Sequence, residues 1–121
     1  MKNPNDILLF LEDSNKNIKK LESEALDFLN QGNTQGHLER MQQKAQLLAG
    51  LSTNAQPYLQ ALPENLRQAA GARLGEFSEN AAKSLEIGSV FFMSALLYPD
   101  EHKPGEPNNL ELFIKELKTQ L

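Results

Sequence analysis

The sequence predicts an all-α protein, folded as an antiparallel up-down helical bundle of three long helices and a shorter C-terminal fourth helix. Two features support this prediction. Apolar residues recur every three or four positions along most of the chain, which is the spacing of one face of an α-helix. The β-branched residues that favour strands are scarce, since valine occurs once and isoleucine four times. With 121 residues, the chain is expected to form a single domain, residues 1–121.

The first helix is expected over residues 4–30. Asn3 is placed to cap it, with Pro4 at the first helical position and Asp6 reaching back to the cap. Gly32 is expected to end it, because glycine readily adopts the left-handed conformation common at helix C-termini. The inward face follows alternating steps of four and three residues: Ile7, Leu11, Ser14, Ile18, Leu21, Ala25 and Phe28.

The second helix is expected to begin at Asn33 or Thr34. Its inward positions follow steps of three and four: Leu38, Met41, Ala45, Leu48, Ser52, Ala55, Leu59 and Leu62. Pro57 lacks a backbone donor and crowds the preceding turn, so the helix is expected to kink within residues 53–57, or to stop there and resume as a short helical turn. The unbroken spacing across the proline favours the kink.

The third helix is expected to begin at Pro63 and to continue to Tyr98, because Pro99 stops it. Its inward positions are Leu66, Ala70, Leu74, Phe77, Ala81, Leu85, Gly88, Phe92 and Ala95. Residues 99–107 are then a connector rich in proline and charge.

The fourth helix is expected to begin after Asn108. Asn108 and Glu111 have the spacing of a capping box, in which each side chain bonds the other residue's backbone N–H. One apolar stripe follows, made of Leu110, Phe113, Ile114, Leu117 and Leu121.

Apolar side chains are in surplus near the end of the third helix. Residues 88–98 read GSVFFMSALLY and are apolar nearly all round, so this segment must be covered by another surface. Either the last helix folds back and covers it completely, or part of it stays exposed and marks an interface. We expect a homodimer that buries this end, with Phe91, Phe92, Leu96, Leu97, Tyr98 and Phe113 as the candidate interface residues.

The residue types that carry catalysis are few. Cysteine is absent, which removes thiol nucleophiles, disulfides and thiolate metal sites together. The sequence contains no glycine-rich phosphate loop, and its serines lie outside glycine elbows. We therefore predict that the protein is not an enzyme and carries no cofactor.

Two alternatives concern the histidines. His37 is a candidate phospho-acceptor, because histidine phosphotransfer domains are acidic helical bundles that carry one exposed histidine on a helix. The sequence departs from those domains in having Met41 where glycine is expected, and in placing His37 in the first turn of its helix. The loop at residues 100–106 offers carboxylates and His102 for a weak divalent metal contact, but His102 and Pro104 stand where a calcium loop needs Asp or Asn.

A third alternative is a ligand slot lined by Ser14, Ser52 and Ser84, which fall at or beside inward positions. The hypothesis that we favour for these serines is simpler: each hydroxyl bonds a carbonyl of its own helix.

The charge of the chain limits its partners. Twelve basic residues are scattered among 16 acidic ones, for a net charge of −4, so we predict no nucleic-acid binding. The apolar runs are shorter than a membrane span, and no signal peptide is evident at the N-terminus, so we expect a cytoplasmic location and no membrane association. The predicted function is a small interaction or adaptor module that binds a protein partner and self-associates.

Overall fold

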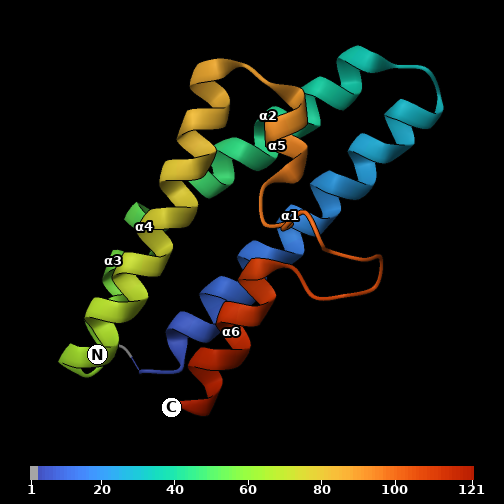
Figure 1. The fold of residues 1–121 in the computed structure, drawn as a ribbon. Helices are drawn as coiled ribbons and strands as arrows, with labels where there is room; N and C mark the ends of the chain where they lie inside the picture. Colours follow the sequence, from blue (N-terminus) through green and yellow to red (C-terminus); the bar gives the residue numbers. More distant parts are fainter. Residues whose placement is uncertain (1–2) are drawn as a thin grey trace.

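A computed structural model describes residues 3–121 of the chain. Across these residues the fold is all-helical and contains no strand, which confirms the predicted class. Residues 3–121 form six helices (Figure 1): α1 (Asp6–Asn30), α2 (Thr34–Ala49), α3 (Leu51–Leu59), α4 (Glu64–Ile87), α5 (Val90–Ala95) and α6 (Asn109–Thr119). None of the helices in this range is long and apolar enough to cross a membrane.

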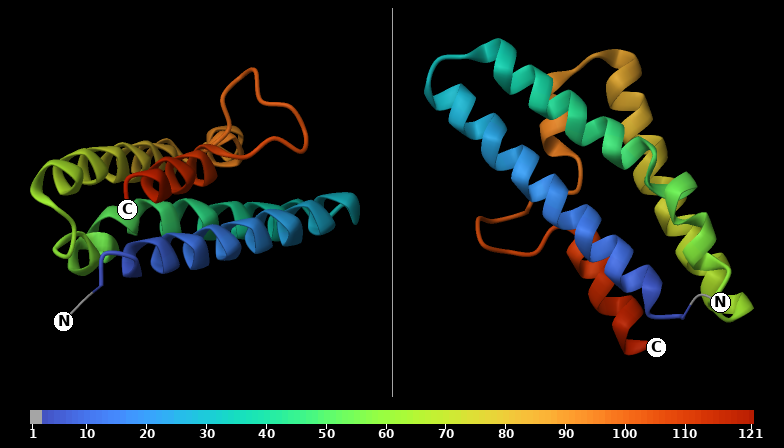
Figure 2. Two further views of the ribbon diagram at one scale, coloured as in Figure 1. Left: turned by 90° about the horizontal axis from the view of Figure 1, so that it is seen from below. Right: turned by 180° about the vertical axis from the view of Figure 1, so that it is seen from behind.

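The helices form two layers (Figure 2). One layer holds α1, α2 and α3, and α4 and α6 pack over it. Helices α1 and α2 form a hairpin, α4 crosses α2 and α3, and α6 lies against α1. Between α4 and α6 the rings of Phe77 and Phe113 meet edge to face, with centroids 6.1 Å apart.

The C-terminal end of α1 follows the prediction, but the helix begins at Asp6, two residues later than expected, with Asn5 and not Asn3 at the N-cap position. The Asn3 side chain accepts a hydrogen bond from the Asn5 N–H, and the Asp6 carboxylate accepts one from the Asn3 N–H. At the other end Gly32 has a φ of +76°, a conformation that favours glycine. The Asn33 side chain then accepts from the Gly36 N–H, so Asn33 rather than Thr34 caps α2.

The break in the second predicted helix occurs at Gly50, earlier than the expected residues 53–57. Pro57 lies inside α3, two residues before that helix ends at Leu59. At the break the hydroxyl of Ser78, from α4, accepts a hydrogen bond from the Ser52 N–H and donates one to the Leu48 carbonyl. The hydroxyl is therefore inserted between the Ser52 N–H and the Leu48 carbonyl, which would bond each other directly in a continuous helix. Such an insertion is a known cause of a helix kink.

The third predicted helix is also divided, which corrects the expectation of one helix to Tyr98. Helix α4 ends at Ile87, and the following Gly88 turns the chain out of the helix with a φ of +72°. Ser89 then caps α5, because its hydroxyl accepts a hydrogen bond from the Phe92 N–H. The predicted capping box of Asn108 and Glu111 is confirmed at the start of α6.

The core joins the two layers. Its larger part contains Ile7 and Leu11 of α1, Leu74 of α4, and the apolar stripe of α6 that begins with Leu110. A smaller cluster contains Ala25, Met41, Ala45 and Met93, so Met93 attaches α5 to the α1–α2 hairpin. Leu97, just after α5, is buried at a φ of +74°, a strained conformation for leucine.

Candidate functional site

Helix α5 presents aromatic side chains to solvent. Phe91 is 73% exposed and Phe92 is 49% exposed, and their rings meet edge to face at 5.8 Å. Ile87, at the end of α4, is 65% exposed. We call these three residues the α5 patch. The turn at Gly88 and Ser89 produces this arrangement, because it points Met93 into the core and leaves the two phenylalanines outside.

A pocket of about 520 Å³ lies beside this patch, between α4, α5 and the start of α6. Its apolar wall contains Leu48, Phe77, Ile87, Phe92, Leu96 and Leu97. Its polar wall contains Arg73, Glu76, Asn80, Lys83, Ser84 and Asn109. The volume of this pocket, which has both an apolar and a polar wall, lies within the range of small-ligand sites.

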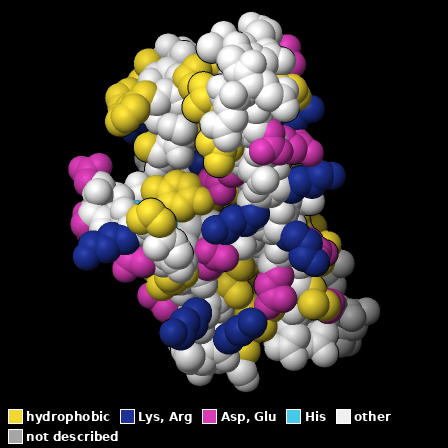
Figure 3. Space-filling view, turned by 90° about the vertical axis from the view of Figure 1, so that its right-hand side faces the viewer, with side chains coloured by type: hydrophobic (Ala, Val, Ile, Leu, Met, Phe, Trp, Pro, Cys, Tyr) yellow, Lys and Arg dark blue, Asp and Glu magenta, His cyan; other side chains and the backbone are white. Residues whose placement is uncertain are grey.

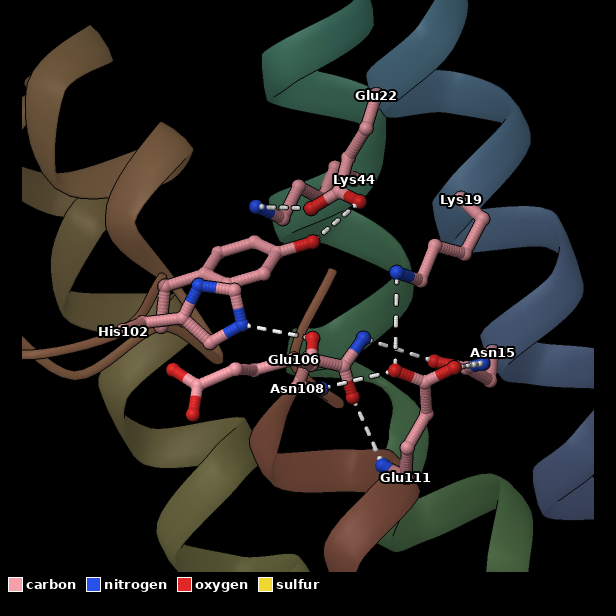
Figure 4. A network of polar contacts seen from close by, with 9 residues as sticks. Asn15, Lys19, Glu22, Lys44, His102, Glu106, Asn108 and Glu111 are labelled. Carbon is pink, nitrogen blue, oxygen red and sulfur yellow. Dashed lines mark hydrogen bonds and ion pairs between the residues drawn. The ribbon is translucent and has the colours of Figure 1, made fainter. Parts of the chain in front are cut away.

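One residue of the pocket lining, Tyr98, contacts a buried charge pair, Lys44 and Glu22 (Figure 4). Lys44 of α2 is fully buried, and its Nζ lies 2.9 Å from Oε2 of Glu22 on α1 and donates to the Ser94 carbonyl at 3.1 Å. The Tyr98 hydroxyl donates to Oε1 of Glu22 at 2.7 Å, and the Tyr98 ring lies against the Lys44 ammonium. These contacts attach the segment after α5 to the α1–α2 hairpin.

Burial changes the acidity of both partners of Glu22. Burial lowers the pKa of Lys44, and the nearby Glu22 carboxylate opposes that change. Burial and the hydrogen bond to Glu22 raise the pKa of Tyr98, so its phenol stays protonated at a pH where a free tyrosine would ionise. The Tyr98 phenol is therefore neutral at ordinary pH where it donates to Glu22.

A second cluster of polar side chains lies at the start of α6 (Figure 4). The buried Asn108 donates to Asn15 at 3.0 Å, and Asn15 donates to the Glu111 carboxylate at 3.2 Å. Partial burial by itself would raise the pKa of Glu111. The hydrogen bonds from the Asn108 backbone and Asn15, together with the nearby Lys19, outweigh this effect and hold the pKa below its usual value. The connector before α6 is thus anchored at both ends.

The connector itself bonds internally. His102 Nε2 lies 2.9 Å from the Glu106 carbonyl, and the Glu106 carboxylate accepts from the Lys103 N–H. Beyond the connector, the Glu111 side chain is part of the capping box of α6. Within residues 3–121 no three His, Asp or Glu side chains come together in a way that could hold a metal ion.

The six candidate interface residues do not share one surface. Phe91 and Phe92 are exposed, and the partly buried Leu96 lines the pocket. Leu97 and Phe113 are buried in the core, and the partly buried Tyr98 is occupied with Glu22 and Lys44, so these three leave the candidate surface. The surface thus keeps two predicted aromatics and gains Ile87, which the sequence pattern did not single out.

The other predicted residues have local roles. His37 lies partly buried in the first turn of α2, with Nδ1 3.1 Å from the Ala25 carbonyl. Ser14 and Ser84 donate to Phe10 and Ala81 of their own helices, which confirms the simpler hypothesis for both. Ser84 lines the pocket, whereas Ser52 lies at the break between α2 and α3.

The face that carries α1 looks different from the α5 patch. Figure 3 shows Lys, Arg, Asp and Glu side chains intermingled there, with hydrophobic side chains in small separate groups. Several of the charges are paired between helices, such as Arg40 with Glu24 at 2.9 Å and Lys118 with Glu12 at 2.9 Å. A surface of mixed sign offers no extended basic track for a phosphate backbone.

Comparisons with known proteins add no assignment to this geometry. The chain matches no known protein family, no curated protein and no solved structure. The α5 patch and the pocket beside it are therefore the features from which a function has to be inferred.

Proposed function

We propose that this chain is a single-domain, antiparallel up-down bundle that works in the cytoplasm as a protein–protein interaction module and self-associates through the α5 patch. The observation that carries the proposal is the joint exposure of Ile87, Phe91 and Phe92 at one end of α4 and α5. Contiguous apolar side chains on a small soluble protein commonly mark an interface. In a symmetric dimer the same patch would serve both protomers.

The exposed area supports a weak dimer. Complete burial of one Phe or Ile side chain contributes about 1.5–3 kcal/mol. Scaled by the observed exposures of 65%, 73% and 49%, two copies of the patch would contribute on the order of 5–10 kcal/mol. Association costs about 4–15 kcal/mol before any surplus appears. A dimer that forms and dissociates with concentration is the expected outcome.

Light scattering on the intact protein tests this proposal over about three decades of concentration. The wild type is expected to gain mass as concentration rises, and a Phe91→Ser/Phe92→Ser double variant is expected to stay monomeric. Leu26→Ser is the matched control, because Leu26 is 54% exposed but lies on α1, away from the patch. A constant monomer mass for the wild type, or equal loss in the control, would rule out self-association through α5.

A further inference from the structure

The pocket beside the α5 patch has an uneven distribution of charge. One face of α4 lines it with residues spaced three or four apart, beginning at Arg73 and ending at Ile87. The Arg73 end is polar, whereas the far end is formed by Ile87 and Phe92. At about 1.5 Å per residue, these two ends lie about 21 Å apart along the helix. The pocket is therefore elongated. Arg73 lies at one end with Glu76 one turn away, and Ile87 and Phe92 form the other end, with Lys83 one turn from Ile87.

Arg73 is the group most available to a ligand. Its guanidinium lies over the Phe77 ring, 5.5 Å from the centroid, which fixes its position. Within residues 3–121, no carboxylate lies within ion-pair distance of Arg73, whereas Arg40, Lys44 and Lys118 each have such a partner. A planar guanidinium that is held in place without a counter-ion is suited to a two-point contact with a carboxylate.

We propose that this pocket binds a carboxylic acid with a long apolar chain, whose carboxylate contacts Arg73 and whose chain lies against Leu96 and Phe92. The polar wall carries two cations, Arg73 and Lys83, against one carboxylate, Glu76, so its net charge favours an anion. Lys83 is only weakly engaged, 3.9 Å from the exposed Glu79.

The neighbouring structure supports the same site. Arg73 and Glu76 also line a smaller hollow of about 250 Å³ between α4 and α6, so these two side chains border both spaces. The strained Leu97 forms part of the pocket wall, and its carbonyl accepts from the Asn109 N–H at 2.9 Å. Strained backbone that is held by its surroundings is concentrated at ligand sites.

The pocket shares Ile87 and Phe92 with the α5 patch, but the two proposals can be tested separately. Arg73 lies outside the α5 patch, so its substitution leaves the proposed dimer contact intact, and the failure of one proposal is distinguishable from the failure of the other. Lys103 offers a matched control, because it is an exposed cation on the connector and lies outside the pocket lining.

The test is a calorimetric titration of the full chain with sodium decanoate below its micelle concentration, with decyltrimethylammonium as the oppositely charged probe. Decanoate is expected to bind saturably at one site, and Arg73→Gln is expected to weaken binding about tenfold or more, as for other hydrogen bonds to charged groups. Lys103→Gln is expected to change nothing, and Ala95→Phe, which fills the pocket while keeping Arg73, is expected to abolish binding.

Three results would overturn the inference: no saturable binding of decanoate, equal affinity in wild type and Arg73→Gln, or equal affinity for the ammonium probe. Circular dichroism of each variant ensures that a loss of binding is read only from folded protein. Amide chemical shifts that change around Arg73 and Leu96 on adding decanoate would place the ligand in this pocket, and shifts confined to other helices would contradict it.

Discussion

Replacement of Ser78 by alanine tests how the chain bends between α2 and α3. The hydroxyl accepts from the Ser52 N–H at 2.9 Å and donates to the Leu48 carbonyl at 2.8 Å, so the variant loses both bonds and leaves a donor and an acceptor without their partner. Each such bond contributes about 0.5–1.5 kcal/mol. Alanine recovers about 0.5 kcal/mol through its higher helix propensity. The expected net loss is about 1–2 kcal/mol in the free energy of unfolding.

The assay is urea unfolding followed by helical circular dichroism, with the slope m compared between variants. Ser84→Ala is the matched control, because Ser84 is also an α4 serine but bonds the Ala81 carbonyl of its own helix. That substitution is expected to change stability by less than about 0.5 kcal/mol, since the carbonyl keeps its helical partner. If Ser78→Ala cost no more than Ser84→Ala, the inserted hydroxyl would not explain the kink.

Three further tests address other parts of the structure. Glu22→Gln removes the counter-charge of the buried Lys44 and is expected to cost about 3–5 kcal/mol in urea unfolding, whereas the double variant Glu22→Gln/Lys44→Met, which removes both charges, should be near neutral. Because folding raises the pKa of Tyr98, the phenol loses its proton at a lower pH in the unfolded chain than in the folded one. The stability that Tyr98 contributes should therefore be intact below about pH 10 and fall above it. In Tyr98→Phe, the fall in stability measured between about pH 9 and 11 should be smaller. Gly88→Ala forces alanine to a φ of +72° and should lower thermal stability by about 1–2 kcal/mol, whereas Gly75→Ala, inside α4 with open space around it, should raise stability by about 0.5–1 kcal/mol. An equal effect of the two glycine substitutions would contradict the assigned turn.

The helical class and the helix ends could be predicted because they depend on local chemistry. Asn33, Gly32 and the pair Asn108–Glu111 act on backbone groups within a few residues, so their spacing in the sequence is enough to identify them. The break at Gly50 was expected at residues 53–57, and the break at Gly88 was not expected; the two errors have opposite causes. The kink at Gly50 depends on Ser78, which lies 26 residues from its partner Ser52 and is invisible to local patterns.

The break at Gly88 could have been found from the sequence. Glycine followed by serine combines a helix C-terminus with a cap for the next helix. The even apolar spacing across Gly88 concealed this signal, because the same spacing continues into α5. Periodicity shows which residues face inward, but it does not show whether the helix axis is continuous.

The candidate site was predictable only in part. Phe91 and Phe92 were identified from composition, but which aromatics stay outside depends on the direction in which α5 packs. Lys44 continues the inward stripe between Met41 and Leu48, and that spacing was an available sign of its burial. Arg73 gave no such sign, since its role depends on the pocket formed by distant segments.

The central claim is that the α5 patch joins two copies of this chain, and amide chemical shifts recorded at low and high protein concentration test it most directly. The account predicts concentration-dependent shifts confined to residues 87–92 and their neighbours at the pocket mouth, together with slower tumbling at the higher concentration. Spectra that superimpose throughout, with monomer tumbling at both concentrations, would contradict it.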